Sequence, residues 1–409
     1  MWRLAWRNLW RQKARSLVTA SAVALVVLST LLFFGLAEAM KNGMFQVLTE
    51  RAGHLVVTRA GADEAREFDA HLIREAARVE AALREVAGEG ELAVLLEVPV
   101  LASNGSRSRG IQLVGLRQTP GLERQFAQDY LSAGRLPDPD SLDEIVLGEA
   151  LARALRVDVG EVVYIFAPGT EGLGAGAYTL VGLLDFPEAA LEGRTAYVSL
   201  AAAQELAAPE AATRFQLHLP DLHRITDEDR LEQVRDRLAQ PLGPELHVKT
   251  WREAEPGLAT LLDLVDPIML VFNGLGFVLA GLLVVNTVYL SLAERIREFG
   301  VIIALGADRW RVMRMVISES LVLVLTGTAV GTALGLGFIA RLAQGFRFPN
   351  ALTEYTVEFG IPAVMYAGLT TGQLVITILF AVGTALAAAL WPAWVAGRLQ
   401  PVEAMRHVT

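Results

Sequence analysis

Hydrophobic and polar positions divide this chain into long blocks. Four stretches contain no Asp, Glu, Lys or Arg, namely residues 16–37, 267–293, 320–340 and 359–397. Each is at least as long as the ~20 apolar residues that an α-helix needs to cross the ~30 Å hydrocarbon core of a bilayer. The pattern therefore predicts four membrane-spanning helices and excludes a soluble cytoplasmic enzyme as the class of protein.

The region between the first and second apolar stretches carries shorter patterns. Residues 63–86 and 227–238 mix charged positions with regularly spaced apolar ones, which predicts amphipathic helices. The glycine-rich residues 168–176 predict a mobile loop. Helices and strands mixed in this way predict an α+β domain, or two small ones. Strands are predicted over residues 92–101, 110–116, 144–147, 162–166, 178–184, 195–199 and 215–219.

Composition sharpens the same division. The 409 residues are 53% hydrophobic and only 20% charged, and the mean hydropathy is +0.39. Residues 38–266 hold 22 basic and 38 acidic side chains, whereas the rest of the chain holds 14 basic and 7 acidic ones. The latter basic side chains border the apolar stretches, so a nucleic-acid partner is not expected. The chain has no cysteine, which excludes disulfides and zinc–thiolate sites.

Charge at the ends of the apolar stretches predicts the orientation in the membrane. Five basic residues precede the first stretch, and five more lie between the second and the third. The positive-inside rule then places both termini in the cytoplasm and the acidic region on the far side. The predicted order is an interfacial helix (1–15), a first span (16–37), an extracytoplasmic α+β domain (38–266), a second span (267–293), a cytoplasmic loop (294–319), a third span (320–340), a short extracytoplasmic segment (341–370), a fourth span (371–394) and a cytoplasmic tail (395–409).

Two features beside the first two spans admit two interpretations each. The first apolar stretch resembles a cleaved secretory signal, but its 22 uncharged residues exceed the ~7–15 of a signal's apolar core, so an uncleaved anchor is favoured. Residues 38–50 and 255–267 adjoin the first and second spans and carry helix-like patterns. They are expected to extend the two membrane helices into a stalk, and ordinary linkers are the alternative.

The opening residues combine aromatic and basic side chains at helical spacing. Tryptophan suits the headgroup layer of a bilayer, and arginine suits the anionic phosphates of lipids. We therefore expect an amphipathic helix on the cytoplasmic leaflet, and the alternative is a basic flank that only sets the orientation. The residues of this predicted interfacial helix are Trp2, Arg3, Trp6, Arg7, Trp10 and Arg11.

Enzymatic chemistry finds little support in the sequence. A phosphate-binding loop needs Gly-Lys-[Ser/Thr], whereas Lys13, Lys41 and Lys249 follow Gln, Met and Val. His218 and His223 lack the helical spacing of a zinc-binding pair, and solvated loop or strand positions are favoured. We therefore expect no catalytic, metal-binding or cofactor-binding residue in this chain.

Two polar residues interrupt the second apolar stretch. Asn286 and Thr287 could mark a transport path, but hydrogen bonds to a neighbouring helix are the favoured interpretation. No carboxylate lies within an apolar stretch, which argues against a proton-driven transporter.

Motifs after the second span resemble those of a known family. Residues 294–300 (ERIREFG), 304–307 (ALGA), Glu319 and the pair Gly327 and Gly331 occur in the order found in MacB/FtsX-type (type VII) ABC transporter permeases. This family includes macrolide-efflux, lipoprotein-releasing and cell-division permeases. Because the chain carries no ATPase segment, it is similar to the stand-alone permeases of the LolC/LolE type. The signature residues are Glu294, Arg297, Glu298, Gly300 and Glu319, and further similar segments are 5–11, 134–136, 144–148, 160–163, 196–200 and 392–406.

The resemblance implies a site for a partner subunit. In such permeases a coupling helix between the second and third spans sits in a groove of a separate ABC ATPase dimer, which binds ATP and Mg. Asp308 can cap a short helix here, and Trp310 with its neighbouring arginines suits an interface. The alternative is a solvated loop whose charges only set the orientation. The resemblance places the coupling helix at Gly306, Ala307, Asp308, Arg309, Trp310, Arg311, Val312, Met313 and Arg314.

The family's mechanism then predicts a passive lever in a bacterial inner membrane. ATP-driven motion of the partner passes through the spans to the far-side domain, and a second copy or a related permease completes the assembly. The first hypothesis for the function of the protein is extraction or export of lipoproteins or other amphiphiles. The alternatives are FtsX-like activation of a cell-wall hydrolase and MacB-like export of small amphiphiles with an adaptor.

Overall fold

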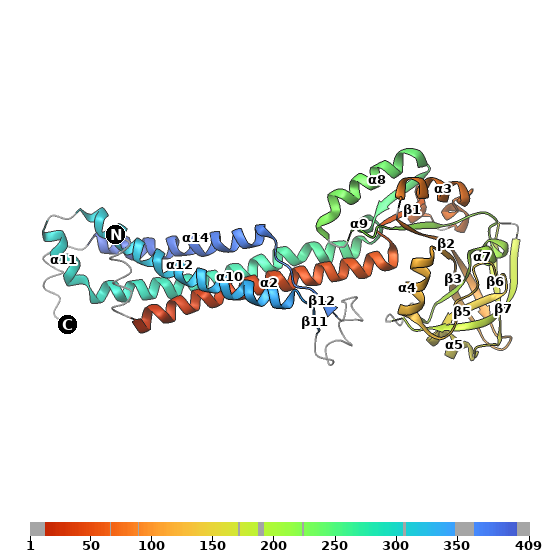
Figure 1. Ribbon diagram of the computed structural model, residues 1–409, viewed down its shortest axis with the longest axis horizontal. Helices are drawn as coiled ribbons and strands as arrows, with labels where there is room; N and C mark the ends of the chain where they lie inside the picture. Colours follow the sequence, from red (N-terminus) through yellow and green to blue (C-terminus); the bar gives the residue numbers. More distant parts are fainter. Residues whose placement is uncertain are drawn as a thin grey trace. The chain divides into compact units, whose positions relative to one another are not determined.

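The computed structural model describes residues 13–65, 67–88, 90–170, 172–186, 192–222, 225–305, 308–347 and 364–398 (Figure 1). These residues form two compact units. The helical unit contains residues 13–41, 260–347 and 364–398, and the inserted domain contains residues 42–259. Residues 1–12 of the predicted interfacial helix and most of the predicted C-terminal tail lie outside the described residues, whereas residues 13–15 already belong to the first long helix.

Among the described residues, four helices are long and apolar enough to cross a membrane. The 40 residues of the first helix rise about 60 Å, roughly twice the thickness of a hydrocarbon core. It continues through residues 38–50, and the second helix already includes residues 256–267. The four helices are α2 (Lys13–Ala52), α10 (Pro256–Glu294), α12 (Arg309–Leu342) and α14 (Thr371–Gly397), accompanied by the short α11 (Ile296–Ala304) and the strands β11 (Phe346–Arg347) and β12 (Val364–Met365).

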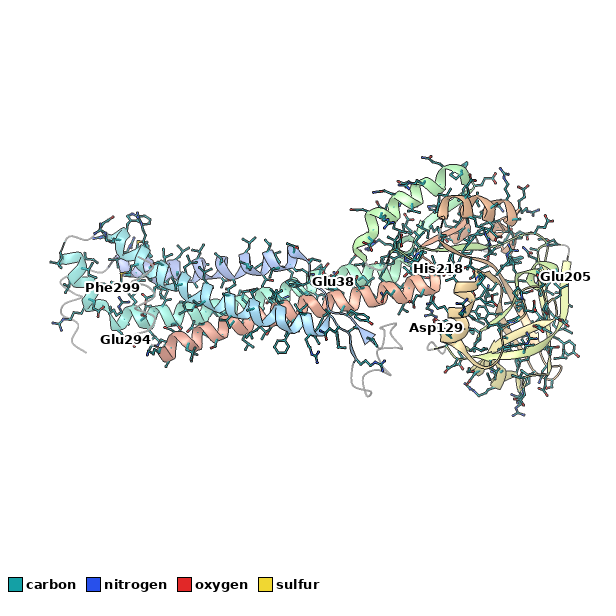
Figure 2. All side chains as sticks on the ribbon, viewed as in Figure 1. Glu38, Asp129, Glu205, His218, Glu294 and Phe299 are labelled. Atoms are coloured by element: carbon teal, nitrogen blue, oxygen red, sulfur yellow. The ribbon has the colours of Figure 1, made fainter. Side chains whose placement is uncertain are left out.

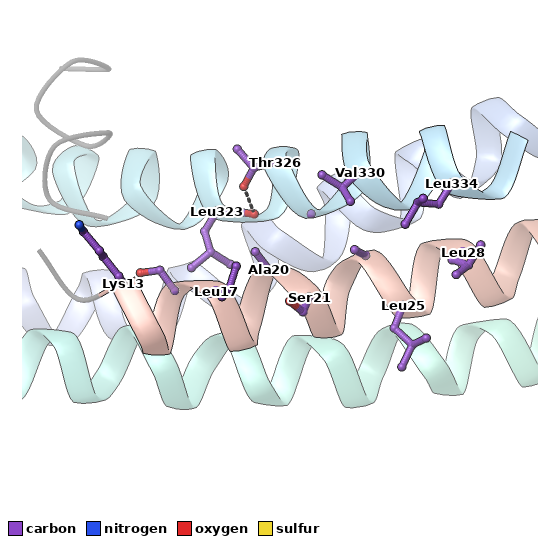
Figure 3. Close-up of a pocket in the computed structure, with 13 residues that line it drawn as sticks. Lys13, Leu17, Ala20, Ser21, Leu25, Leu28, Leu323, Thr326, Val330 and Leu334 are labelled. Atoms are coloured by element: carbon purple, nitrogen blue, oxygen red, sulfur yellow. Dashed lines mark hydrogen bonds between the residues drawn. The ribbon is translucent and has the colours of Figure 1, made fainter. Parts of the chain in front are cut away.

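Glycines let α12 approach the backbone of α2 closely. A Cβ atom added to Gly327 would lie 2.7 Å from the carbonyl oxygen of Ala20, and one added to Gly331 would lie 2.5 Å from that of Ala24. In a membrane the hydrophobic effect does not drive helices together, so they associate through close packing, which small residues at four-residue steps allow. Beside this contact an apolar groove of about 710 Å³ runs between the two helices (Figure 3).

A hydrogen bond between helices bears on the polar residues of the second span. The hydroxyls of Thr19 in α2 and Thr287 in α10 lie 2.6 Å apart and are buried. Thr287 therefore bonds a neighbouring helix, as the favoured interpretation of its sequence position expects.

The inserted domain is built on one mixed sheet, whose strands follow the order β10-β1-β9-β2-β3-β8-β5-β7-β4. Strand β6 pairs with both β2 and β7, which closes β2, β3, β8, β5, β7 and β6 into a ring. The predicted fold class, four membrane helices with an α+β domain inserted after the first, is confirmed. The strands are β1 (Leu55–Arg59), β2 (Glu91–Ser103), β3 (Ser108–Gln118), β4 (Leu131–Gly134), β5 (Glu144–Gly148), β6 (Val162–Gly169), β7 (Gly172–Leu184), β8 (Thr195–Ser199), β9 (Arg214–His218) and β10 (Leu246–Thr250).

Alternation along the strands fills this barrel. Val98, Val100 and Ala102 of β2 are buried, as are Val163 and Ile165 of β6. Because successive side chains of a strand point to opposite faces, the residues between them lie on the outer face. Helices surround the domain: α3 (Ala76–Ala87), α4 (Pro120–Tyr130), α5 (Glu149–Leu155), α7 (Leu200–Leu206), α8 (Glu228–Leu242) and α9 (Trp251–Ala254).

The helix predicted over residues 63–86 is only half correct. Its second half is α3, but the first half forms the short 3₁₀ helices η2 (Ala62–Glu64) and η3 (Phe68–His71). Ile73 instead forms a β-bridge with Ala212, and Glu75 adopts a left-handed conformation with φ of 60°. Tertiary pairing therefore overrides the local helical pattern.

The mobile loop predicted over residues 168–176 is wrong. Most of this segment belongs to the hairpin of β6 and β7, in which Ala167 pairs with Gly174 and Pro168 with Leu173. A Cβ atom at Gly174 would lie 2.1 Å from the carbonyl oxygen of Leu206 in α7. Glycine is used here for close approach to a helix end.

Two histidines are packed together where α2 passes into β1. The ring of His218, at the end of β9, lies 6.4 Å from the ring of His54, centroid to centroid. The Nδ1 atom of His54 accepts a hydrogen bond from the amide of Leu219 at 3.1 Å, and its Nε2 lies 2.8 Å from the carbonyl oxygen of Leu222. His218 is buried and not solvated, and His223 lies outside the described residues.

Acidification is expected to destabilise the protein through His218. Burial, with a smaller contribution from His54, lowers the pKa of His218 from 6.5 to about 4. The unfolded chain binds a proton as the pH falls below 6.5, whereas the folded chain resists until about pH 4, so the stability present above pH 6.5 is lost between these values, by about 2 kcal/mol at pH 5. The measurement is the unfolding free energy of the full chain against pH. His218→Gln should flatten the dependence between pH 6.5 and 4, and an unchanged slope would contradict the assignment.

Candidate functional site

The end of α10 bends sharply into the short helix α11. Arg295, between the two helices, has φ of −115° and ψ of 13°, outside the helical region. The sequence predicts a break only at residues 306–308, so this earlier junction is a new feature. It makes α11 a separate element, whose placement depends on the side chains around Arg295.

Arg295 joins three elements through its side chain. Its Nη1 atom lies 3.2 Å from Oε2 of Glu319 in α12, and its Nε donates to Glu298 in α11 at 3.1 Å. The guanidinium also lies 5.1 Å from the ring centroid of Phe299. The side chains of Arg295 and Glu319 are only 14% and 18% exposed, so their ion pair is screened weakly by water.

A second ion pair reaches the first helix at the same end of the unit. Arg15 of α2 lies 3.0 Å from Glu294, the last residue of α10. Figure 2 shows Glu294 and Phe299 together at this end. Three of the sequence-predicted signature residues therefore form ion pairs here: Glu294 with Arg15, and Glu298 and Glu319 with Arg295. These pairs link α2, α10, α11 and α12.

Helix α11 has one buried face and one exposed face. Phe299 and Gly300 are buried, and Phe299 belongs to the core of the helical unit. Leu305 is 83% exposed and Trp310 is 60% exposed. Exposed residues of α11 and of the start of α12 form what we call the coupling surface: Arg297, Val301, Ile302, Leu305, Arg309, Trp310, Arg311 and Arg314.

The predicted coupling helix differs from the structure in several respects. Asp308 stands at the N-terminal cap of α12 but its side chain makes no capping hydrogen bond. The helix that follows is not short, since it continues to Leu342 as the third span. Val312 is 2% exposed inside the helical core, so it cannot anchor a partner, and Met313 is half-buried beside Gly397. Residues of the predicted interfacial and coupling helices that lie outside the described residues are Trp2, Arg3, Trp6, Arg7, Trp10, Arg11, Gly306 and Ala307.

Sequence reasoning did not select Arg295, Arg15 or Leu305 as site residues. Arg295 stands in the signature motif, yet it was counted only as one of the charges that set the orientation. Its role depends on Glu319, which lies 24 positions later and meets it only in the folded bundle. The short apolar run of α11 beside charged residues was the one available signal for the exposed face.

The architecture defines a class, a membrane protein with four apolar helices and a domain inserted after the first of them. Residues 16–240 match the MacB-like periplasmic core domain, and residues 270–401 match the C-terminal region of FtsX-like permeases. The chain belongs to the MacB/FtsX-type family of ABC transporter permeases. It is accordingly a multi-pass membrane protein of the permease class.

Named relatives fall in two branches of this family. The lipoprotein-releasing system transmembrane protein LolC of Xylella fastidiosa is 24% identical over 275 residues, 64% of each chain. The macrolide export ATP-binding/permease protein MacB of Hyphomonas neptunium is 24% identical over 424 residues, 98% of this chain and 60% of MacB. The chain thus matches less than two thirds of the length of either relative. The periplasmic region of MacB from Actinobacillus actinomycetemcomitans superposes with a TM-score of 0.35 and 12% identity, over 50% of this chain and 92% of that region.

Proposed function

We propose that this chain is the permease subunit of an ABC transporter and transmits ATP-driven motion from a separate cytoplasmic ATPase to its inserted domain. The observation that carries the proposal is the coupling surface formed by α11 and the start of α12. Exposed apolar side chains beside four exposed arginines suit a protein partner, because aromatic, aliphatic and arginine side chains dominate interface energies. ATP and Mg are then held by the partner, and both chain termini face the cytoplasm with it.

The ion pairs supply the route for the motion. A displacement of α11 acts on Arg295, which is bonded to Glu319 of α12 and adjoins α10 directly. At the other end of the helical unit, Lys41 of α2 lies 2.9 Å from Asp266 of α10. Helices α2 and α10 are therefore joined at both ends, and both continue without a break into the sequence of the inserted domain.

The proposed cargo is a lipoprotein or another amphiphile of the bacterial inner membrane. Support comes from the LolC relatives, whose name states lipoprotein release. The four apolar stretches contain no Asp, Glu, Lys or Arg. Cargo that stays in the lipid phase until it meets the inserted domain therefore fits better than an ion moving down a central pore.

The coupling surface can be tested by removing its two most exposed apolar residues. The double variant Leu305→Ser, Trp310→Ser is expected to weaken ATPase binding by more than tenfold, since anchors at interface centres are often worth ~2 kcal/mol or more each. The measurement uses the ATPase that copurifies from native membranes, identified by mass spectrometry, and its affinity for the chain in nanodiscs. Leu142→Ser, an equally simple change at an exposed leucine of the inserted domain, is the matched control. Unchanged ATPase affinity in the double variant would overturn the docking site.

A further inference from the structure

One part of the barrel's outer face is apolar and uncovered among the described residues. Alternate residues of β6 point outward, and Val162, Tyr164 and Phe166 are all exposed. Leu101 of β2 is the register partner of Phe166, and Leu173, at the start of β7, is 80% exposed. These five residues are called the apolar face. A water-facing domain rarely exposes so many large apolar side chains together without a binding role.

The remaining outer face shows what a covered surface looks like in the same domain. Leu122 of α4 packs with Leu95 and Val114, and the ring of Phe126 in α4 meets that of Tyr197 edge to face, with 5.3 Å between the ring centroids. Helix α4 lies on the opposite side of the barrel from the β6–β7 hairpin (Figure 1). The apolar face therefore has side chains like those that α4 covers, but no helix or strand from the described part of the chain packs on it.

A groove covers part of this face and has one arginine in its lining. It has a volume of about 900 Å³, within the range of small-molecule sites, and it includes Pro99, Leu101, Phe166 and Leu173. Arg194, just before β8, lines the groove, is exposed, and has no carboxylate partner among the described residues. Arg194 therefore places a positive charge beside the apolar lining of the groove.

We propose that this groove binds an anionic amphiphile, with its hydrocarbon part on the apolar face and its carboxylate or phosphate at Arg194. The guanidinium suits both acidic groups, because its fork of donors matches their paired oxygens. The inference rests on the proposed function and names the substrate class that the inserted domain would hold. It assigns the domain a direct contact with cargo in addition to its place at the end of the lever.

Strand addition by a protein partner fits the centre of the groove less well. At Leu101 and Phe166, β2 is hydrogen-bonded between β3 and β6, and β6 is hydrogen-bonded between β2 and β7. No strand edge is free at that point for a peptide to extend the sheet. A ligand that lies across the face, with its contacts made by side chains, is therefore favoured.

Photolabelling of the full chain in phosphatidylcholine nanodiscs tests this site. The probe is a diazirine analogue of palmitic acid, and labelled peptides are mapped by mass spectrometry. Label is expected on β2, β6 and the start of β7, competed by palmitate and much less by hexadecanol. Arg194→Gln and Phe166→Ser are each expected to lower this label about fivefold, which is ~1 kcal/mol. The matched controls Arg124→Gln and Leu142→Ser change similarly exposed residues outside the groove and should leave it unchanged.

Each outcome has a definite meaning. Label confined to the membrane helices would overturn the site, and so would label in the groove that hexadecanol competes as well as palmitate or that Arg194→Gln leaves intact. Protection of the groove peptides by a copurified protein, without fatty-acid label, would assign the face to a protein partner and also overturn the proposal. The assay contains no ATPase and no ATP, so a failure of the proposed coupling leaves its result unaffected and the two failures remain distinguishable.

Discussion

Glu319→Met is expected to abolish the ATP-driven response of the inserted domain and to destabilise the chain by about 3 kcal/mol. The substitution leaves Arg295, whose side chain is only 14% exposed, without its partner on α12. Removing one member of a buried ion pair costs about 3–5 kcal/mol because the remaining charge is uncompensated, and the partial exposure here places the loss at the lower end. The unfolding free energy in detergent measures the stability. Hydrogen–deuterium exchange of the inserted domain with and without ATP, in the complex with the ATPase, measures the response.

The double variant Arg295→Met, Glu319→Met separates transmission from stability. Replacing both members of a buried pair with apolar residues is often neutral or stabilising, so the unfolding free energy should return towards that of the unmodified chain. The response to ATP should remain absent, because the link between α11 and α12 is still missing. Glu294→Gln, which breaks the more exposed pair with Arg15, is the control and should cost less than about 1 kcal/mol. A double variant that still responds to ATP would show that the pair has only a structural role.

Sequence patterns predicted those parts of this fold that depend on local chemistry. The four membrane helices follow from uncharged length alone, and the strand predicted over residues 195–199 coincides with β8. Residues 63–75 and 168–176 were misassigned because their structure is decided by Ala212 and Leu206, which meet them only in the folded domain. Closure of the barrel through β6 has no local signature either, since β6 pairs not only with its hairpin neighbour β7 but also with β2, which lies far earlier in the sequence.

The candidate site divides along the same line. A resemblance of motifs singled out Glu294, Glu298 and Glu319, and in the structure Glu298 and Glu319 pair with Arg295 whereas Glu294 pairs with Arg15. The motif could not show that Val312 faces the core whereas Leu305 is exposed, because the burial of Val312 depends on how α12 packs against the other helices. The chain leaves the helical conformation at Arg295, between α10 and α11, although the helical pattern of the sequence continues through this residue.

Gly331→Ala is expected to cost about 2–3 kcal/mol although it adds one methyl group. Its Cβ would lie 2.5 Å from the carbonyl oxygen of Ala24 and 2.9 Å from the Cβ of Val27. A backbone oxygen within a helix cannot move alone, so α12 and α2 must separate along their contact, which is the penalty of an overpacked core. The greater helix propensity of alanine, worth up to ~1 kcal/mol, offsets only part of this.

Gly337→Ala in the same helix supplies the matched control. Nothing lies within 4 Å of the position its Cβ would take, so only the propensity gain remains and the variant should be neutral or slightly more stable. Denaturation of the two purified variants with SDS, followed by tryptophan fluorescence, compares them under one condition. A loss of stability in Gly331→Ala with no loss in Gly337→Ala would establish that the glycine contact holds the first and third spans together. Equal stability of the two variants would show that the spans accommodate the methyl group and that α2 and α12 are not in rigid contact. Such a result would also weaken the lever, because a loose first span cannot pass displacement from α12 to the inserted domain.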